Sequence, residues 1–144
     1  MYERINFREA NPKAVNMLSA ASKHLSSIDS KLRALVELRV SQINGCVFCV
    51  HLHLKEARDE GEDQRRLDAT CVWHESNLFT EQERAAFTWA ETLTRISETH
   101  APDSDYEALK EHFTEQQIVD LTFIISTMNM WNRMSVAMRR LPDG

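Results

Sequence analysis

Glycine and proline are scarce in this sequence, with three of each among its 144 residues. Because these residues form tight turns and interrupt helices, their scarcity argues against a fold of many short strands joined by hairpins. The alternation of apolar and polar residues that is typical of half-buried strands is also missing. The sequence therefore predicts an all-α fold, and its length predicts a single domain over residues 1–144.

Other absences narrow the class of protein. The sequence has no run of 18 apolar residues, and its first residues, MYERINFREA, lack the apolar core of a signal peptide. Its net charge is −5, so nothing indicates binding to nucleic acid or to an anionic membrane. Three cysteines, an odd number, argue against a secreted disulfide framework. We therefore expect a cytoplasmic protein in which paired cysteines have a catalytic or metal-binding role.

Capping residues and apolar stripes at helical spacing predict six to seven helices that follow an extended arm over residues 1–10. Two of the helices open with capping-box signatures, at Thr80-x-x-Glu83 and Thr114-x-x-Gln117. The helices are expected at about 12–25, from a cap at Ser30 to the break at Asn44-Gly45, and at about 46–60, 64–76, 81–98, 104–112 and 115–139. The apolar faces of helices 81–98 and 115–139 are wide for a monomer, which favours an oligomer. The polar residues Asn129 to Arg133 are expected to brace a neighbouring helix or subunit, or else to line a pocket.

The most informative stretch runs from Glu37 to His53 and reads ELRVSQINGCVFCVHLH. Asn44-Gly45 ends one helix, so a second helix can begin at Cys46. At about 100° per residue, Cys46, Cys49 and His53 then fall within roughly 60° of one another around this second helix. Cys46 and Cys49 lie one turn apart, which is close enough for a disulfide with little backbone movement.

This arrangement predicts a reactive dithiol. A helix N-terminus and a neighbouring imidazole both favour the thiolate, which is the form that attacks peroxides and disulfides. If one thiol is oxidised to a sulfenic acid, the second thiol can condense with it to give a disulfide. The apolar stripe of this helix is expected at Val47, Val50, Leu54 and Ala57. That stripe would place Cys46 and His53 at its edge and leave the thiols only partly shielded from water.

Two other roles for the cysteines remain open at this stage. They could be small buried apolar residues, as free cysteines often are. They could also bind a structural zinc with His53 as a third ligand, although three ligands on one helix face would leave the metal site open. We therefore predict no bound metal. Cys71 and His74 are three residues apart and suggest a second thiol site, but Cys71 is expected to be a packing residue.

The segment VELRVSQINGCVFCVHLHLKEAR resembles the carboxymuconolactone decarboxylase family, and within it the cysteine-bearing, AhpD-like alkylhydroperoxidase branch. The likeness covers the chain from about Asn6 to Leu141 and implies an AhpD-like helical bundle. It implies that Cys49 meets the peroxide and that Cys46 resolves the oxidised thiol. It also implies that His53 and Glu37 form a proton relay.

The sequence departs from the founding alkylhydroperoxidase at two positions. Ala34 stands where the founding enzyme has its relay glutamate, so Glu37, one helical turn closer to the cysteines, is expected to take that role. Phe48 stands where the founding enzyme has a histidine between the two cysteines. Both changes bear on the efficiency of the relay and on the choice of peroxide.

The resemblance also implies an activity and its partners. We expect a peroxidase that reduces hydroperoxides in antioxidant defence, with the Cys46–Cys49 disulfide as its redox group and no bound cofactor. An external thiol donor, for example a lipoyl-bearing protein, would reduce this disulfide. The resemblance further implies a homotrimer or homohexamer. The alternatives are a redox sensor or binding module that uses the same dithiol, and a decarboxylase-type lyase, whose branch of the family does not use the dithiol.

Overall fold

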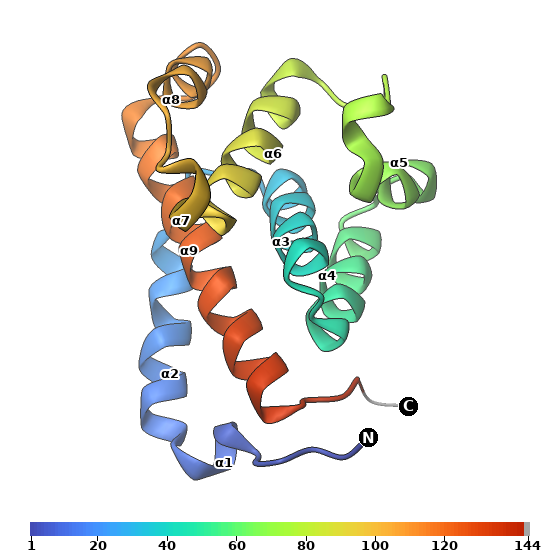
Figure 1. The fold of residues 1–144 in the computed structure, drawn as a ribbon, viewed down its shortest axis with the longest axis vertical. Helices are drawn as coiled ribbons and strands as arrows, with labels where there is room; N and C mark the ends of the chain where they lie inside the picture. The colour runs from blue at the N-terminus through green and yellow to red at the C-terminus, as the bar shows by residue number, and fades with distance from the viewer. Residues whose placement is uncertain (143–144) are drawn as a thin grey trace.

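The computed structural model describes residues 1–142, and within that range all regular secondary structure is helical. This confirms the predicted all-α fold (Figure 1). The α-helices are α1 (Phe7–Ala10), α2 (Pro12–Ala20), α3 (Ser30–Asn44), α4 (Val47–Asp59), α5 (Gln64–Ala69), α6 (Glu81–Thr94), α7 (Ile96–Thr99), α8 (Asp103–Lys110) and α9 (Glu115–Met138). Two 3₁₀ helices, η1 (Ala21–His24) and η2 (Thr70–Glu75), extend α2 and α5.

The predicted helices differ from the structure mainly at their ends. The expected helix 64–76 changes from α to 3₁₀ after Ala69 and has a kink at Val72, and the expected helix 81–98 is interrupted at Arg95, which has non-helical backbone angles. The expectation of an extended arm over residues 1–10 was wrong in its second half, where α1 forms. The Asn6 side chain caps α1 by accepting the backbone N–H of Arg8 at 3.2 Å.

Helix α3 is the centre of the molecule and packs against α4, α6 and α9 (Figure 1). Its apolar residues point to two sides, and both sides are buried. Val36 and Val40 belong to a core cluster shared with α6 and α9, whereas Leu35 and Leu38 belong to a second cluster with Phe87. A helix that is apolar on two faces is stable only when other elements cover both of them. This arrangement fixes the position of α3, which carries Glu37.

Polar side chains fasten the end of α3 to α9. The Asn44 amide donates to the side-chain oxygens of Asn129 and Asn132, both at 2.9 Å, and the Asn132 amide donates to Ser41 Oγ at 3.1 Å. Asn129 and Asn132, polar residues within the apolar helix α9, therefore brace a neighbouring helix, which was the first of the two roles expected for this segment. They also fix the start of α4, since Gly45 follows Asn44 in a left-handed conformation with φ 66°.

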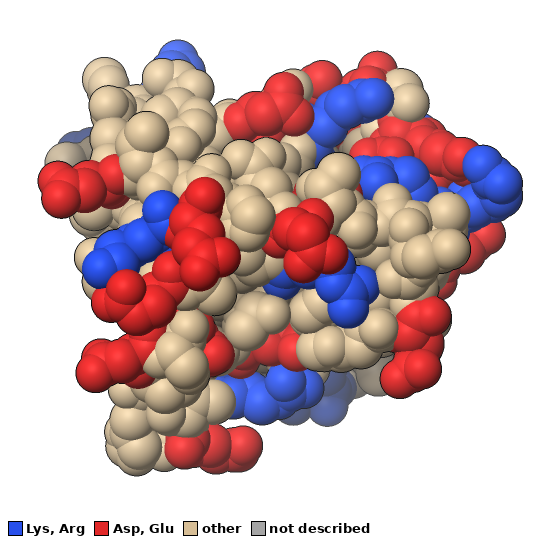
Figure 2. All heavy atoms as spheres, turned by 90° about the horizontal axis from the view of Figure 1, so that it is seen from above, with Lys and Arg blue, Asp and Glu red and all other residues tan. Residues whose placement is uncertain are grey.

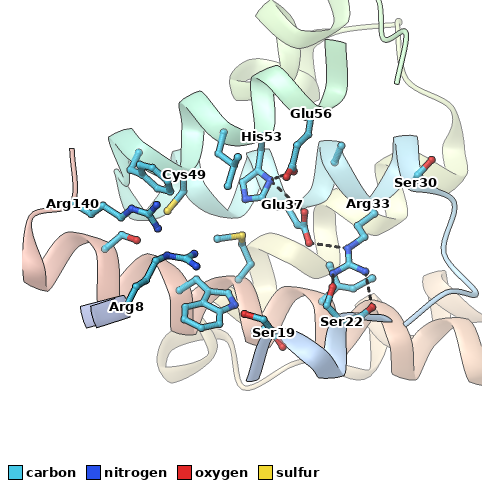
Figure 3. A pocket seen from close by; sticks show the side chains of 18 of the residues that line it. Arg8, Ser19, Ser22, Ser30, Arg33, Glu37, Cys49, His53, Glu56 and Arg140 are labelled. Atoms are coloured by element: carbon cyan, nitrogen blue, oxygen red, sulfur yellow. Dashed lines mark hydrogen bonds and ion pairs between the residues drawn. The ribbon is translucent and has the colours of Figure 1, made fainter. Parts of the chain in front are cut away.

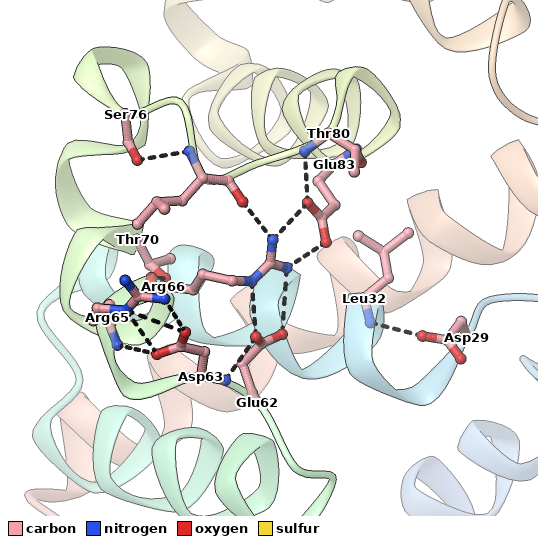
Figure 4. A network of polar contacts seen from close by, with 11 residues as sticks. Asp29, Leu32, Glu62, Asp63, Arg65, Arg66, Thr70, Ser76, Thr80 and Glu83 are labelled. Atoms are coloured by element: carbon pink, nitrogen blue, oxygen red, sulfur yellow. Dashed lines mark hydrogen bonds and ion pairs between the residues drawn. The ribbon is translucent and has the colours of Figure 1, made fainter.

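A second polar network fastens α5 to α6 (Figure 4). The Arg66 guanidinium donates to Glu62, to Glu83 and to the Leu78 backbone oxygen, at 2.6 Å for the last. The hydrogen bond to Glu83 is the main reason that the pKa of Arg66 lies above its usual value. This region lies away from the cysteines and has a structural role.

The two ends of the described chain lie close together at the base of the molecule (Figure 1). The Arg4 backbone N–H donates to the Met138 oxygen at 2.8 Å, and the Arg4 guanidinium donates to the Ala137 oxygen at 3.0 Å. Acidic and basic side chains are interspersed on the upper face (Figure 2). No helix within residues 1–142 is long and apolar enough to cross a membrane.

Exposed apolar residues occur on the helices that were expected to form an interface. Val119 and Phe123 of α9 are exposed. Ile96, which lies within the expected helix 81–98, is also exposed because α6 ends before it. The oligomeric state remains a prediction.

Candidate functional site

Cys46 and Cys49 form a disulfide at the start of α4, with an S–S distance of 2.17 Å and a Cα–Cα distance of 5.3 Å. Cys46 is the N-cap of the helix, and its sulfur accepts the backbone N–H of Cys49 at 3.3 Å. The turn at Gly45 thus places both sulfurs at the helix N-terminus, where a thiolate is stabilised. In this oxidised form the pair has no thiolate that could bind the zinc considered above.

The cysteines are more buried than the sequence predicted. Cys46, Cys49 and His53 are 1%, 2% and 5% exposed, whereas Val47 is 49% exposed. The expected apolar stripe was wrong at Val47, because α4 lies between the two core clusters and this first residue projects past both. Cys46 and Cys49 pack in the first cluster, and Val50 contacts the second.

His53 is held by two carboxylates, one predicted and one not. Its Nδ1 is 2.8 Å from Glu56 Oε2 and 3.3 Å from Glu37 Oε2 (Figure 3). The first contact has hydrogen-bond geometry, so Nδ1–H donates to Glu56, and Glu37 lies beside it as an anion. Arg33 Nε in turn donates to Glu37 at 2.9 Å. The structure therefore brings Glu37 and His53 together as expected.

Sequence reasoning missed Glu56, although a signal for it was present. Glu56 follows His53 by three residues on the same helix, a spacing at which side chains contact each other. Its carboxylate fixes the imidazole tautomer with the proton on Nδ1, which leaves the lone pair on Nε2. Within residues 1–142, no hydrogen-bond partner reaches the buried Nε2 atom. The ring therefore offers an unused base.

A cavity of about 490 Å³ lies beside these residues. Cys49, His53 and Glu37 line it, but Cys46 does not, so the two sulfurs differ in their access to a small molecule. Ala34 and Phe48, the two positions that depart from the founding pattern, also line it. The apolar part of its wall is formed by Phe7, Phe48, Leu52, Ile124, Met128 and Trp131. Such a wall suits an apolar substrate.

A comparison of the sequence with models of protein families identifies the family. The model of the carboxymuconolactone decarboxylase family matches residues 10–92, which is more than half of the chain. The chain belongs to the carboxymuconolactone decarboxylase family. The uncharacterized family relative YdfG of Bacillus subtilis (strain 168) is 37% identical over 140 residues, which cover 96% of this chain and 95% of YdfG.

Solved structures support the assignment of this chain to the AhpD-like branch of the family. A protein of unknown function from Agrobacterium tumefaciens, described as a candidate AhpD antioxidant defence protein, is 39% identical. Its TM-score is 0.96, and the match covers 99% of each chain. A peroxidase-related protein with an AhpD core from Ralstonia eutropha JMP134 is 22% identical and has a TM-score of 0.83. That match covers 95% of this chain and 74% of the other, and it shows the common fold.

Two further groups of side chains carry metal-ligating or nucleophilic atoms. Glu37, His53 and Glu56 offer ligand atoms within 4.8 Å of one another, a set that could hold a cation. Their hydrogen bonds and the Arg33 guanidinium already account for the placement of these carboxylates. Cys71 is exposed, with Sγ 3.6 Å from the Asp68 oxygen. The expectation that Cys71 packs in the interior was wrong, because η2 turns it to the surface.

Proposed function

We propose that this AhpD-like protein reduces hydroperoxides through a dithiol–disulfide cycle of Cys46 and Cys49. One observation carries the proposal: Cys49 lines the cavity together with His53, whose buried Nε2 has no hydrogen-bond partner within residues 1–142. A general base needs direct contact with the proton that it removes, or contact through one water. His53 follows Cys49 by one helical turn, so it is the base placed to serve that thiol.

The first step consumes the peroxide. In the reduced protein, the Cys49 thiol gives its proton to His53 Nε2, and the thiolate attacks the outer oxygen of ROOH. The O–O bond breaks, an S–O bond forms, and the leaving alkoxide takes the proton from the imidazolium to give ROH. Glu37 and Glu56 stabilise that imidazolium while it carries the proton. Cys49 is left as a sulfenic acid.

The second step closes the disulfide. The Cys46 sulfur attacks the Cys49 sulfur, the S–S bond forms and the S–O bond breaks, and the sulfenic hydroxyl takes the Cys46 proton and leaves as water. An external dithiol then returns the pair to the reduced form and becomes a disulfide itself. A lipoyl-bearing protein is the donor that we propose for this step. A homotrimer or homohexamer is the proposed assembly.

The test is a single-turnover oxidation of reduced protein by cumene hydroperoxide, followed by mass spectrometry with a sulfenic-acid trap. Cys49→Ser should abolish peroxide reduction, whereas Cys46→Ser should stop with one trapped sulfenic acid on Cys49. Cys71→Ser is the matched control and should behave as wild type. A trapped adduct on Cys46 in Cys49→Ser, with none on Cys49 in Cys46→Ser, would reverse the roles. The helix N-terminus around the Cys46 sulfur would then outweigh the imidazole.

A sensor that uses the same dithiol is the second candidate. The burial of both sulfurs favours it, because a small oxidant reaches them more easily than a protein reductant does. Multiple turnovers with added dithiol support the enzyme, whereas a single oxidation that no dithiol reverses supports the sensor. A decarboxylase-type lyase would act without the cysteines, so lyase activity retained in Cys49→Ser would replace the proposal.

A further inference from the structure

The cavity has two ends of opposite charge. Arg8 and Arg140 lie at the end that Cys49 occupies, whereas Glu37, Glu56 and Arg33 lie toward the other end (Figure 3). A cavity for neutral alkyl hydroperoxides alone needs no guanidinium next to its reactive sulfur. The two arginines are therefore a feature that the proposed cycle does not use.

The two arginines come from opposite ends of the chain, and the fold brings them together. Arg8 belongs to α1, and Arg140 follows α9 directly. The hydrogen bond between the Arg4 N–H and the Met138 oxygen joins the two segments. Phe7, next to Arg8, is buried and stacks on Trp131 with ring centroids 6.4 Å apart. The backbone on both sides of this end of the cavity is thus fixed.

The arginines are placed to bind an anion. The Arg140 guanidinium carbon lies 3.6 Å from the centroid of the Phe48 ring, and Phe48 is the neighbour of Cys49. Stacking orients a guanidinium so that its N–H groups point outward from its edge, the geometry that a carboxylate requires. Within residues 1–142, no carboxylate forms an ion pair with Arg8. The acidic side chains of the cavity would repel an anion from its other end.

From this geometry we infer that Arg8 and Arg140 form a carboxylate-binding subsite, and that the preferred substrate is a hydroperoxide with a carboxylate on a compact, apolar body. This inference rests on the proposed peroxidase function and names its substrate class. The aromatic and aliphatic wall holds the body, the arginines hold the carboxylate, and the peroxide oxygen is directed to Cys49. Because both arginines lie at the end of the cavity that Cys49 occupies, one compact body must carry both the carboxylate and the O–O group.

A matched pair of peroxides tests the inference. Reduced protein is mixed with 4-(2-hydroperoxypropan-2-yl)benzoic acid or with its methyl ester, and the rate of disulfide formation is measured without any reductant. These peroxides differ in charge and have the same reactive group, so the ratio of their rates cancels any effect of the arginines on the thiol itself. The acid should react at least about tenfold faster, as expected for a charge-assisted hydrogen-bonded pair.

Variants assign the preference to the subsite. The ratio should fall to about one in Arg8→Gln/Arg140→Gln. It should be unchanged in Arg95→Gln/Arg133→Gln, which removes two charges from exposed positions that do not line the cavity. The wild-type ratio should also decrease as ionic strength rises, a readout that does not depend on the folding of any variant. Equal ratios in wild type and in Arg8→Gln/Arg140→Gln would overturn the inference.

Two further experiments are needed. The first asks whether the subsite binds a carboxylate of the peroxide or of the reductant, and the second tests the subsite separately from the peroxidase activity. If dihydrolipoate reduces the disulfide much faster than dihydrolipoamide while the peroxide pair shows no preference, the subsite serves the reductant and the inference is wrong. Calorimetry with 4-isopropylbenzoate and 4-isopropylbenzamide measures the subsite in the oxidised protein without any turnover. Carboxylate binding that is lost in Arg8→Gln/Arg140→Gln would support the subsite even if no peroxide were reduced, in which case only the peroxidase proposal would fail.

Discussion

Two histidines of this protein contact glutamates, and their surroundings differ. His74 Nε2 lies 3.1 Å from Glu91 Oε2, but the His74 side chain is 57% exposed. The Glu91 carboxylate also accepts hydrogen bonds from Arg39 at 2.7 Å and from Trp73 Nε1 at 3.0 Å. His53, by contrast, has a side chain that is 7% exposed, and its Nε2 has no hydrogen-bond partner among the residues that the structure describes.

The difference separates a structural cluster from a chemical one. Arg39, Trp73 and Glu91 come from α3, η2 and α6, so their hydrogen bonds tie three elements together. Burial alone would raise the pKa of Glu91, but the hydrogen bonds from Arg39, Trp73 and His74 outweigh it and hold that pKa below its usual value. Every group in this cluster stabilises a carboxylate. In the other cluster the carboxylates orient a base whose second nitrogen is unused, beside a disulfide and a cavity.

Replacing each histidine by alanine should give the largest contrast. His53→Ala should slow the oxidation of the dithiol by peroxide about 10²–10⁴-fold, the usual effect of a lost general base. His74→Ala is the matched control and should change this rate by less than about twofold, since exposed ion pairs contribute little. Stopped-flow measurement of single-turnover oxidation compares the two. Similar rates for both variants would remove the reason for assigning chemistry to His53.

Replacing the glutamates should give the opposite result for the two clusters. Loss of Glu91 should lower the stability of the protein, and the rate of dithiol oxidation should not change. Glu91→Gln leaves the Arg39 guanidinium, 13% exposed, without its anionic partner. We expect a loss of about 2–3 kcal/mol in the free energy of unfolding at pH 7. The half-exposed Glu56 provides the control, and Glu56→Gln should cost less than about 1 kcal/mol. Urea unfolding measures both.

The dependence of this loss on pH follows from the direction of the pKa shift. The folded-state pKa of Glu91 lies below the usual 4.5, so its carboxylate contributes stability above about that pH. The contribution decreases as the pH falls through the folded-state value. The difference in stability between wild type and Glu91→Gln should therefore be largest near neutral pH and should narrow below about pH 4.5. A difference that stays constant down to pH 3 would contradict this account.

The sequence predicted more of the chemical cluster than of the structural one. Cys46, Cys49 and His53 lie within two turns of one helix, so helical geometry alone brings them together, and Glu37 is found through the family resemblance. The contact of Arg39 with Glu91 joins positions far apart in the chain, and no local spacing signals it. The burial of Cys49 was underestimated for the same reason, since it depends on how α3 and α9 pack around α4. The cavity, with Arg8 and Arg140 from the two chain ends, is likewise a property of tertiary packing.

The smallest difference in rate is expected between variants of the two carboxylates that contact His53. Glu37 is the more buried anion, at 13% against 47% exposure for the Glu56 side chain. In Glu37→Gln the Arg33 guanidinium remains near the imidazole without a counterion and disfavours its protonated form. We therefore expect peroxide-driven oxidation to slow about tenfold, as for other residues that support a reactive histidine.

Glu56→Gln should slow the same oxidation by only about twofold to threefold. Its amide oxygen can still accept the Nδ1–H of His53, and the charge that it loses is largely screened by water. Arg33→Gln added to Glu37→Gln should recover part of the rate, because it removes the uncompensated cation. If Glu56→Gln were the slower of the two single variants, the hydrogen bond that fixes the tautomer would matter more than the buried charge. The predicted relay residue would then be Glu56 and not Glu37.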